Sequence, residues 1–193
     1  DLRSKNFNST ILKDTDTVVI LASLVGDPIS NKYKKATKAI NITATKKFID
    51  KSIKLGVKKL IFVSTCSNYG LIETNLAAKE NYKLNPLSPY AKSKVEIENY
   101  LIKKKSKELN TKIFILRFAT AFGFSERMRF DLTVNEFIKT IMQKKKLIIY
   151  DENTWRPYCH VKDFARLIYK IFLSSKKNKF EILNVGENKN NAT

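Results

Sequence analysis

The sequence predicts an α/β fold in which helices cover a parallel sheet. Short apolar runs rich in β-branched residues alternate with longer segments whose apolar residues recur at helical spacing. This alternation is the pattern of strands joined by helices within one sheet. With 193 residues, 43% of them hydrophobic, the chain can form one substantial core.

Five segments are expected to form strands, because each is a short apolar run bounded by polar residues or glycine. They are residues 17–22, 57–64, 112–118, 147–150 and 180–185.

Helices are expected between these runs, over residues 31–55, from Ser88 onward, and over 132–145 and 162–174. Gly56 stands where a helix commonly ends. The Ser88 hydroxyl can cap free amides, and Pro89 then occupies the first helical position, where its missing N–H does no harm. The first helix should bury the face formed by Ala36, Ile40, Ala44, Phe48 and Ile49.

The composition limits the classes of partner. A net charge of +19 suggests a polyanion, but the lysines fall on expected helix faces without interleaved aromatic residues, so we do not expect nucleic acid binding. No apolar run approaches the ~20 residues that span a bilayer, so we expect a cytoplasmic protein without membrane contact. Cys66 and Cys159 have no partners at metal-like spacing, which predicts reduced thiols and no metal site.

The strongest chemical signal is Tyr90 with Lys94 on one face of a predicted helix. A phenol with a pKa near 10 is a poor base at neutral pH, and an adjacent ammonium favours its ionised form. Thr65 follows a strand at the carboxyl end, where open α/β sheets bind ligands, and could hold a substrate alcohol against the phenol. The three residues therefore predict proton abstraction from an alcohol.

The order of these segments resembles the extended short-chain dehydrogenases/reductases, and among them the NAD-dependent epimerases and dehydratases of nucleotide-linked sugars. The matching segments are Ser-Thr-x-x-x-Tyr-Gly at 64–70, Ser-Pro-Tyr-x-x-x-Lys at 88–94 and Leu-Arg-Phe at 116–118. The resemblance spans nearly the whole chain. It implies a Rossmann-like, doubly wound parallel sheet, with Thr65, Tyr90 and Lys94 as catalytic residues.

The resemblance also implies NAD as cofactor, while the choice between NAD and NADP rests on residues expected before Asp1. The implied cofactor contacts are Asp1, Leu2, Ala22, Asn41, Ser64, Tyr90, Lys94 and Phe118. The five glycines form no glycine-rich phosphate-binding turn. We therefore expect a sheet that is incomplete at the N-terminus, and a 193-residue chain that binds cofactor weakly and does not turn over alone.

Substrate contacts are implied further along the chain. Arg156, in Arg-x-x-x-His-Val-x-Asp, matches the family's diphosphate-binding arginine, a planar cation suited to bidentate phosphate contacts. Asn135 resembles a residue that reaches the nucleotide, and Thr120 stands where the family often has asparagine. Thr65 and Tyr90 would contact the sugar, whereas the family pattern treats His160 as structural.

The resemblance implies oxidation of a sugar hydroxyl, at C4, with hydride transfer to NAD. The related dehydratases carry acidic residues after the threonine, where this chain has Cys66 and Ser67. Epimerisation needs no second acid or base and therefore ranks first, ahead of a keto-sugar reductase or a dehydratase. A non-catalytic nucleotide-binding or RNA-binding relative is the alternative of another class.

Two parts are expected: a partial cofactor-binding domain over residues 1–125 and a small, partial substrate-binding region over 126–193. The resemblance also implies a homodimer that pairs through the helix of Tyr90 and Lys94.

Overall fold

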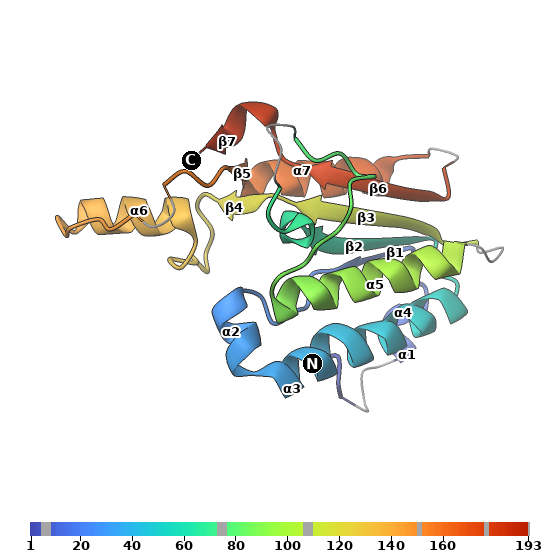
Figure 1. Cartoon of the computed structure of the whole chain (residues 1–193). Helices are drawn as coiled ribbons and strands as arrows, with labels where there is room; N and C mark the ends of the chain where they lie inside the picture. The colour runs from blue at the N-terminus through green and yellow to red at the C-terminus, as the bar shows by residue number, and fades with distance from the viewer. Residues whose placement is uncertain (5–8, 73–76, 106–109, 150–151, 176–177, 193) are drawn as a thin grey trace. The chain divides into compact units, whose positions relative to one another are not determined.

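The computed structural model describes residues 1–4, 9–72, 77–105, 110–149, 152–175 and 178–192 (Figure 1). The chain forms two compact units, and each is described by itself. Unit 1 consists of Asp1–Arg117 and Ser175–Leu183, and unit 2 of Phe118–Ser174 and Asn184–Thr193.

A four-stranded sheet with the order β1-β2-β3-β6 forms the frame of unit 1. The strands are β1 (Thr17–Ile20), β2 (Lys59–Thr65), β3 (Lys112–Phe118) and β6 (Phe180–Val185). β1 and β2 are parallel, with Thr17 opposite Lys59 and Ile20 opposite Phe62. The segment between them is almost entirely helical, so the predicted α/β class with a parallel, Rossmann-like sheet is confirmed.

The segment predicted as one helix over 31–55 is divided. The helical region begins four residues before the predicted start, with α2 (Asp27–Lys32), and continues with α3 (Lys34–Thr37), a π-helical stretch η1 (Lys38–Ala44) and α4 (Thr45–Lys54). A short α1 (Ser9–Leu12) precedes β1. Tyr33 breaks the helix because its backbone leaves the helical region, at φ −117° and ψ 50°. Of the face expected on this helix, Ala44 and Ile49 are buried, while Ala36, Ile40 and Phe48 are half-buried.

Two local signals in the sequence are confirmed. Gly56 follows α4 with φ +79°, and hydrogen bonds from Gly56 N–H to Ile53 O and from Val57 N–H to Ser52 O close a Schellman motif. α5 (Pro89–Lys105) begins with Pro89, and the Ser88 hydroxyl accepts the Ala91 N–H at 3.1 Å. The start of α5 is therefore fixed five residues before Lys94.

The core of unit 1 lies between the sheet and the layer formed by α4 and α5, which lie side by side in Figure 1. Each element contributes fully or nearly fully buried apolar side chains. They are Val18 and Ile20 of β1, Leu60 and Phe62 of β2, Ile113 and Ile115 of β3, Ile49 of α4, and Ile97 and Leu101 of α5.

Unit 2 contains a small sheet with the order β4-β5-β7. β4 (Thr120–Phe122) and β5 (Arg156–His160) are parallel, and β5 pairs antiparallel with β7 (Asn191–Ala192). The expected helices are confirmed as α6 (Thr133–Met142) and α7 (Val161–Leu173), and a 3-10 turn, η3 (Asn188–Asn190), precedes β7.

The strand predicted at 147–150 is wrong where the structure describes it. Residues 147–149 are not in a strand, and Ile148 and Ile149 are 58% and 53% exposed, so no sheet covers this apolar run. Tyr150 lies outside the described residues.

Candidate active site

One face of α5 carries the predicted base Tyr90, the predicted Lys94 and a third ionisable residue, Glu98, which the sequence did not predict. Tyr90, Lys94 and Glu98 follow at intervals of four, so they lie along one side of the helix. Tyr90 is half-buried, Lys94 is 4% exposed and Glu98 is fully buried. Charged side chains are rarely this buried without specific partners. Lys94 and Glu98 both have such partners in the structure.

The Lys94 ammonium is fixed against β2. Its Nζ donates to the carbonyl oxygen of Val63 at 2.8 Å, and lies 4.9 Å from the ring centroid of Phe62 and 5.7 Å from that of Tyr90. Burial lowers the pKa of Lys94 from 10.5 to about 8, while the Glu98 carboxylate acts in the opposite direction and raises it. Lys94 therefore remains mainly protonated at neutral pH, beside the Tyr90 ring.

Ser64 and Thr65 end β2, two residues or fewer from the carbonyl that holds Lys94. Thr65 is 8% exposed and caps a 3-10 helix, η2 (Cys66–Tyr69), by accepting the Ser67 N–H at 3.2 Å. This cap fixes the Thr65 hydroxyl at the carboxyl end of the strand. The same turn carries Cys66 and Ser67, which directly follow Thr65.

Asn41 lies at the centre of the π-helical stretch and is 4% exposed. Its side chain accepts the N–H of Leu24 at 2.8 Å and donates to the carbonyl oxygen of Leu24 at 3.1 Å. It also donates to the Ser93 hydroxyl at 3.1 Å, and that hydroxyl donates to the carbonyl oxygen of Tyr90. Asn41 thus joins the loop after β1 to the first turns of α5.

The remaining cofactor candidates of unit 1 lie near the surface. Ala22 is exposed, two residues after β1 ends, and Leu2 is half-buried. The exposed Asp1 carboxylate accepts hydrogen bonds from the backbone N–H and the guanidinium of Arg3.

Unit 2 contains the other candidates, and three of them have defined surroundings. Phe118 stacks on Phe164 with ring centroids 3.8 Å apart. Thr120 is half-buried in β4. Asn135 is 7% exposed, accepts the Gly123 N–H at 3.3 Å and donates to the carbonyl oxygen of Arg129 at 3.0 Å.

Arg156 and His160 stand at the two ends of β5. Arg156 is exposed, and its guanidinium has no hydrogen-bond or ion-pair partner among the residues that the structure describes. His160 caps α7, because its Nδ1 accepts the Lys162 N–H at 3.2 Å. The only histidine in the sequence therefore stabilises a helix, which agrees with the structural role that its sequence context predicts.

The sequence reasoning missed Glu98 and assigned no role to Arg117. Glu98 is fully buried on α5 and Arg117, at the end of β3, is 3% exposed, and they form an ion pair of 2.6 Å. The available signal was a glutamate four residues after Lys94, on the side of the helix that faces the core.

Within the described ranges, no group of three or more His, Cys, Asp or Glu side chains could hold a metal ion. No helix in those ranges combines the length and the apolar composition that a bilayer-spanning helix needs.

In unit 1, α5 and the end of β2 thus bring together a phenol, a buried ammonium and a hydroxyl. The ammonium has three N–H groups, and Val63 is its one hydrogen-bond acceptor among the described residues. Hydroxyl groups of a bound ligand could accept from the others. The arrangement suits removal of a proton from an alcohol by Tyr90 while Lys94 supplies positive charge.

Comparisons with known proteins point to one family. The model of the NAD dependent epimerase/dehydratase family matches residues 1–186. The UDP-glucuronate 4-epimerase of Thermodesulfobacterium geofontis is 33% identical over 153 residues, which are 78% of this chain and 45% of that protein. A Methanocaldococcus jannaschii relative is 29% identical over 98% of this chain and 61% of its own length.

Among solved structures, the UDP-glucuronic acid 4-epimerase of Bacillus cereus, in complex with UDP-glucuronic acid and NAD, superposes with a TM-score of 0.84. It is 29% identical, and the alignment covers 96% of this chain and 58% of that chain. The present chain spans less than two thirds of each of these relatives.

Proposed function

Because this chain belongs to the NAD dependent epimerase/dehydratase family, we propose that the protein inverts C4 of a nucleotide-linked sugar with NAD as cofactor. One observation carries the proposal: Tyr90 and the buried ammonium of Lys94 lie on one face of α5, and Lys94 is bonded to the strand that ends in Thr65. The UDP-sugar epimerases among its relatives support the substrate class.

Tyr90 is the general base in this proposal. It removes the proton of the C4 hydroxyl, and the Thr65 hydroxyl holds the same oxygen by a hydrogen bond. Lys94 stabilises the phenolate through its charge, which burial makes more effective. Bound NAD would supply the acceptor for the C4 hydride and the donor for its return to the opposite face of the sugar. Tyr90 then returns the proton to the C4 oxygen.

The cofactor fits the described residues in one respect that the structure makes visible. The buried ammonium of Lys94 has N–H groups to donate beyond its bond to Val63, and ribose hydroxyls can accept them. We assign Asp1, Leu2, Ala22, Asn41, Ser64 and Phe118 to the cofactor as well, with residues 1–125 as the cofactor-binding part. Asn41 would act through the loop that it holds at Leu24.

We assign the nucleotide part of the substrate to residues 126–193, with Thr120 as an additional contact. Arg156 is suited to the diphosphate, because its guanidinium is exposed and has no protein partner among the described residues. Asn135 would support that region from α6, since its side chain already holds the Gly123 and Arg129 backbone.

Epimerisation is favoured over dehydration by the residues that follow Thr65. Elimination of water needs an acid and a base near the neighbouring carbons, and Cys66 and Ser67 provide no carboxyl group. A keto-sugar reductase would use the same Tyr90 and Lys94 in the reverse direction and remains the second candidate.

The proposal includes a homodimer that pairs through α5. Ile102 is 40% exposed on this helix, as an apolar contact in such an interface would be. Sedimentation velocity of the wild-type protein and of Ile102→Lys tests this part: we expect a dimer that the substitution weakens. A monomeric wild type would refute it.

Turnover of defined substrates tests the reaction. The full-length protein is incubated with NAD and a panel of UDP-, GDP- and dTDP-sugars, while reduced nicotinamide is followed by absorbance and the sugar product by mass. We expect an isomer of unchanged mass without net cofactor reduction, abolished by Tyr90→Phe. Loss of water would establish a dehydratase, and absence of turnover with every sugar would contradict the proposal.

A further inference from the structure

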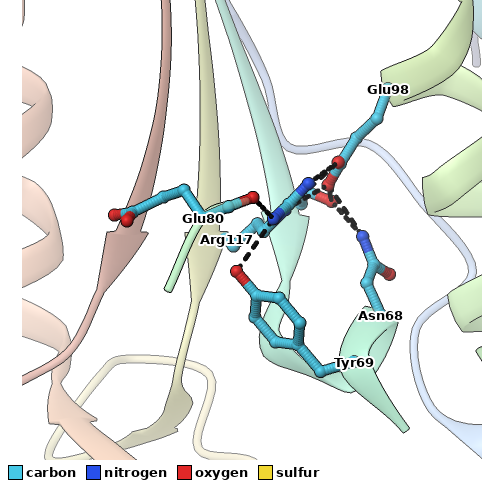
Figure 2. A network of polar contacts seen from close by, with 6 residues as sticks. Asn68, Tyr69, Glu80, Glu98 and Arg117 are labelled. Atoms are coloured by element: carbon cyan, nitrogen blue, oxygen red, sulfur yellow. Dashed lines mark hydrogen bonds and ion pairs between the residues drawn. The ribbon is translucent and has the colours of Figure 1, made fainter. Parts of the chain in front are cut away.

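Glu98 is the centre of a buried polar network in unit 1 (Figure 2). Its carboxylate accepts hydrogen bonds from the Ser64 hydroxyl at 2.5 Å and from the Asn68 amide at 2.7 Å. Two guanidinium nitrogens of Arg117 donate to it, Nη2 at 2.6 Å and Nε at 3.1 Å. Three elements, α5, β3 and the end of β2 with its following turn, therefore meet at one carboxyl group.

The network continues from Arg117 to the segment after β2. The Nη1 atom of Arg117 donates to the Tyr69 hydroxyl at 2.8 Å and to the carbonyl oxygen of Glu80 at 2.9 Å. Figure 2 shows both contacts on the side of the guanidinium that faces away from Glu98. Arg117 thus holds the end of η2 and a part of the chain that precedes α5.

Stability alone does not explain this arrangement. A buried ion pair commonly contributes no more than well-packed apolar side chains of the same volume, because both charges lose their hydration. Asn68 adds a further cost: it directs its amide N–H groups to Glu98 and Ser64, and its Oδ1 is left without a hydrogen-bond partner among the described residues. The network therefore indicates a role in holding these elements in position and not a contribution to the free energy of folding.

The contacts lie on both sides of the candidate catalytic hydroxyl. Ser64 directly precedes Thr65, and Asn68 belongs to the turn that Thr65 caps. On α5, Glu98 lies one turn after Lys94 and two turns after Tyr90. The Glu98 carboxylate thus connects α5, which carries Tyr90, to the end of β2, which carries Thr65.

We propose that Glu98 is a positioning residue that fixes the Tyr90 face of α5 against the end of β2, with Arg117 orienting its carboxylate. Its effect on turnover rests on the function proposed above, whereas its effect on the geometry does not. Displacement of a reacting group by about 1 Å can reduce turnover ~100-fold, so a rigid connection between the two elements has catalytic value.

Two substitutions separate the effect of the length of the Glu98 side chain from the effect of its charge. Glu98→Asp keeps the charge but withdraws the carboxylate by one methylene, and Glu98→Gln keeps the shape but removes the charge. Glu96→Gln is the matched control, because Glu96 lies on the exposed side of α5 and pairs with Lys46. The double variant Glu98→Gln with Arg117→Met removes both charges and keeps the test valid if a single variant does not fold.

The primary readout is amide hydrogen exchange measured by NMR on the whole chain. In Glu98→Asp and in the double variant we expect the Ser67 amide, which donates to Thr65, to exchange at least 10-fold faster than in the wild type while amides of β1, which has no residue in the network, keep their rates. Equal acceleration at both places would indicate global destabilisation and overturn the proposal. Wild-type exchange at Ser67 in the folded variants would also overturn it.

Titration of Lys94, followed by the NMR signal of its side-chain carbon next to nitrogen, is the second readout. In Glu98→Gln the pKa of Lys94 should fall below about 8, because the carboxylate that raises it is gone, and Glu96→Gln should leave it unchanged. An unchanged Lys94 midpoint in folded Glu98→Gln would contradict the proposal, because the Glu98 carboxylate would then have no electrostatic effect on Lys94. In the full-length enzyme, we expect the Glu98 variants to have a kcat 10- to 100-fold lower than the wild type, with little change in KM. If the wild type itself lacks turnover, the proposed function fails, while exchange and titration still decide the role of Glu98.

Discussion

The Nζ atom of Lys94 donates a hydrogen bond of 2.8 Å to the carbonyl oxygen of Val63. This bond attaches α5 to β2 two residues before Thr65. It holds a cation inside unit 1, 5.7 Å from the centroid of the Tyr90 ring. The position of this cation has consequences for stability as well as for chemistry.

Lys94→Met should stabilise the protein at neutral pH and abolish turnover. Burial lowers the pKa of Lys94 from 10.5 to about 8, so the charged form is less stable in the folded protein than in the unfolded chain. A difference of this size corresponds to about 3 kcal/mol at pH 7. Because methionine also loses the hydrogen bond to Val63, we expect a net gain of about 1–2 kcal/mol.

The pH dependence of this gain identifies its cause. The unfolded wild type binds more protons than the folded form between about pH 8 and 10.5, so its stability rises with pH in this window. The advantage of Lys94→Met, measured by urea unfolding at pH 7 and at pH 10, should therefore shrink at the higher pH. An advantage of equal size at both values would show that packing, and not the charge, is responsible.

Gly123→Ala should destabilise unit 2 more than Gly56→Ala destabilises unit 1. Both glycines have positive φ, +110° and +79°, which costs an alanine about 1–2 kcal/mol. A Cβ at Gly123 would lie 2.4 Å from the His160 ring, whereas a Cβ at Gly56 would meet no atom within 4 Å. The free energies of unfolding of the two variants test this, and equal losses would mean that the His160 ring moves aside without cost.

His160→Ala should cost about 1 kcal/mol of stability, because α7 loses the side chain that accepts the Lys162 N–H. His160→Asn, whose amide oxygen can accept the same N–H, should recover most of that loss. Thermal unfolding of both variants gives the comparison. If asparagine and alanine were equally destabilising, the contact of His160 with Phe122, and not the cap, would account for the effect.

Local patterns predicted most of unit 1. The strands over 112–118 and 180–185 coincide with β3 and β6, because each is an apolar run that becomes buried or half-buried in the sheet. Gly56 and Ser88 marked a helix end and a helix start through backbone chemistry that needs no tertiary contact. The π turn at Asn41 was not predictable in this way, since its side chain bonds to Leu24, 17 residues away.

The strands of unit 2 were harder to predict from local sequence patterns. β5 contains Arg156, Pro157 and His160, a composition that does not suggest a strand, and it forms because β4 and β7 pair with it. The apolar residues 147–149 had the composition of a strand, but they have no strand to pair with in the described structure. Pairing between distant segments, and not local propensity, decides both cases.

Thr65, Tyr90 and Lys94 could be selected from the sequence as candidate site residues, because Tyr90 and Lys94 lie one helical turn apart and Thr65 ends a strand. The buried partners of these residues depend on the packing of α5 against β2 and β3. Glu98 resembled an ordinary helix-surface glutamate in the sequence. Its burial is explained by donors that lie far from it in the chain, among them the guanidinium of Arg117, 19 residues away.

Incorporation of deuterium at C4 distinguishes the proposed reaction from its alternatives. The full-length protein is incubated in D2O with NAD and the UDP-sugar that it isomerises, and the product is examined by NMR and mass spectrometry after its hydroxyl groups have exchanged back in H2O. In the proposed reaction Tyr90 moves only the hydroxyl proton, and the hydrogen on C4 leaves and returns as hydride without meeting solvent. The account predicts an inverted C4 that retains its original hydrogen and carries no deuterium. A product with one deuterium at C4 would contradict it, because inversion would then proceed by removal of the C4 proton to solvent.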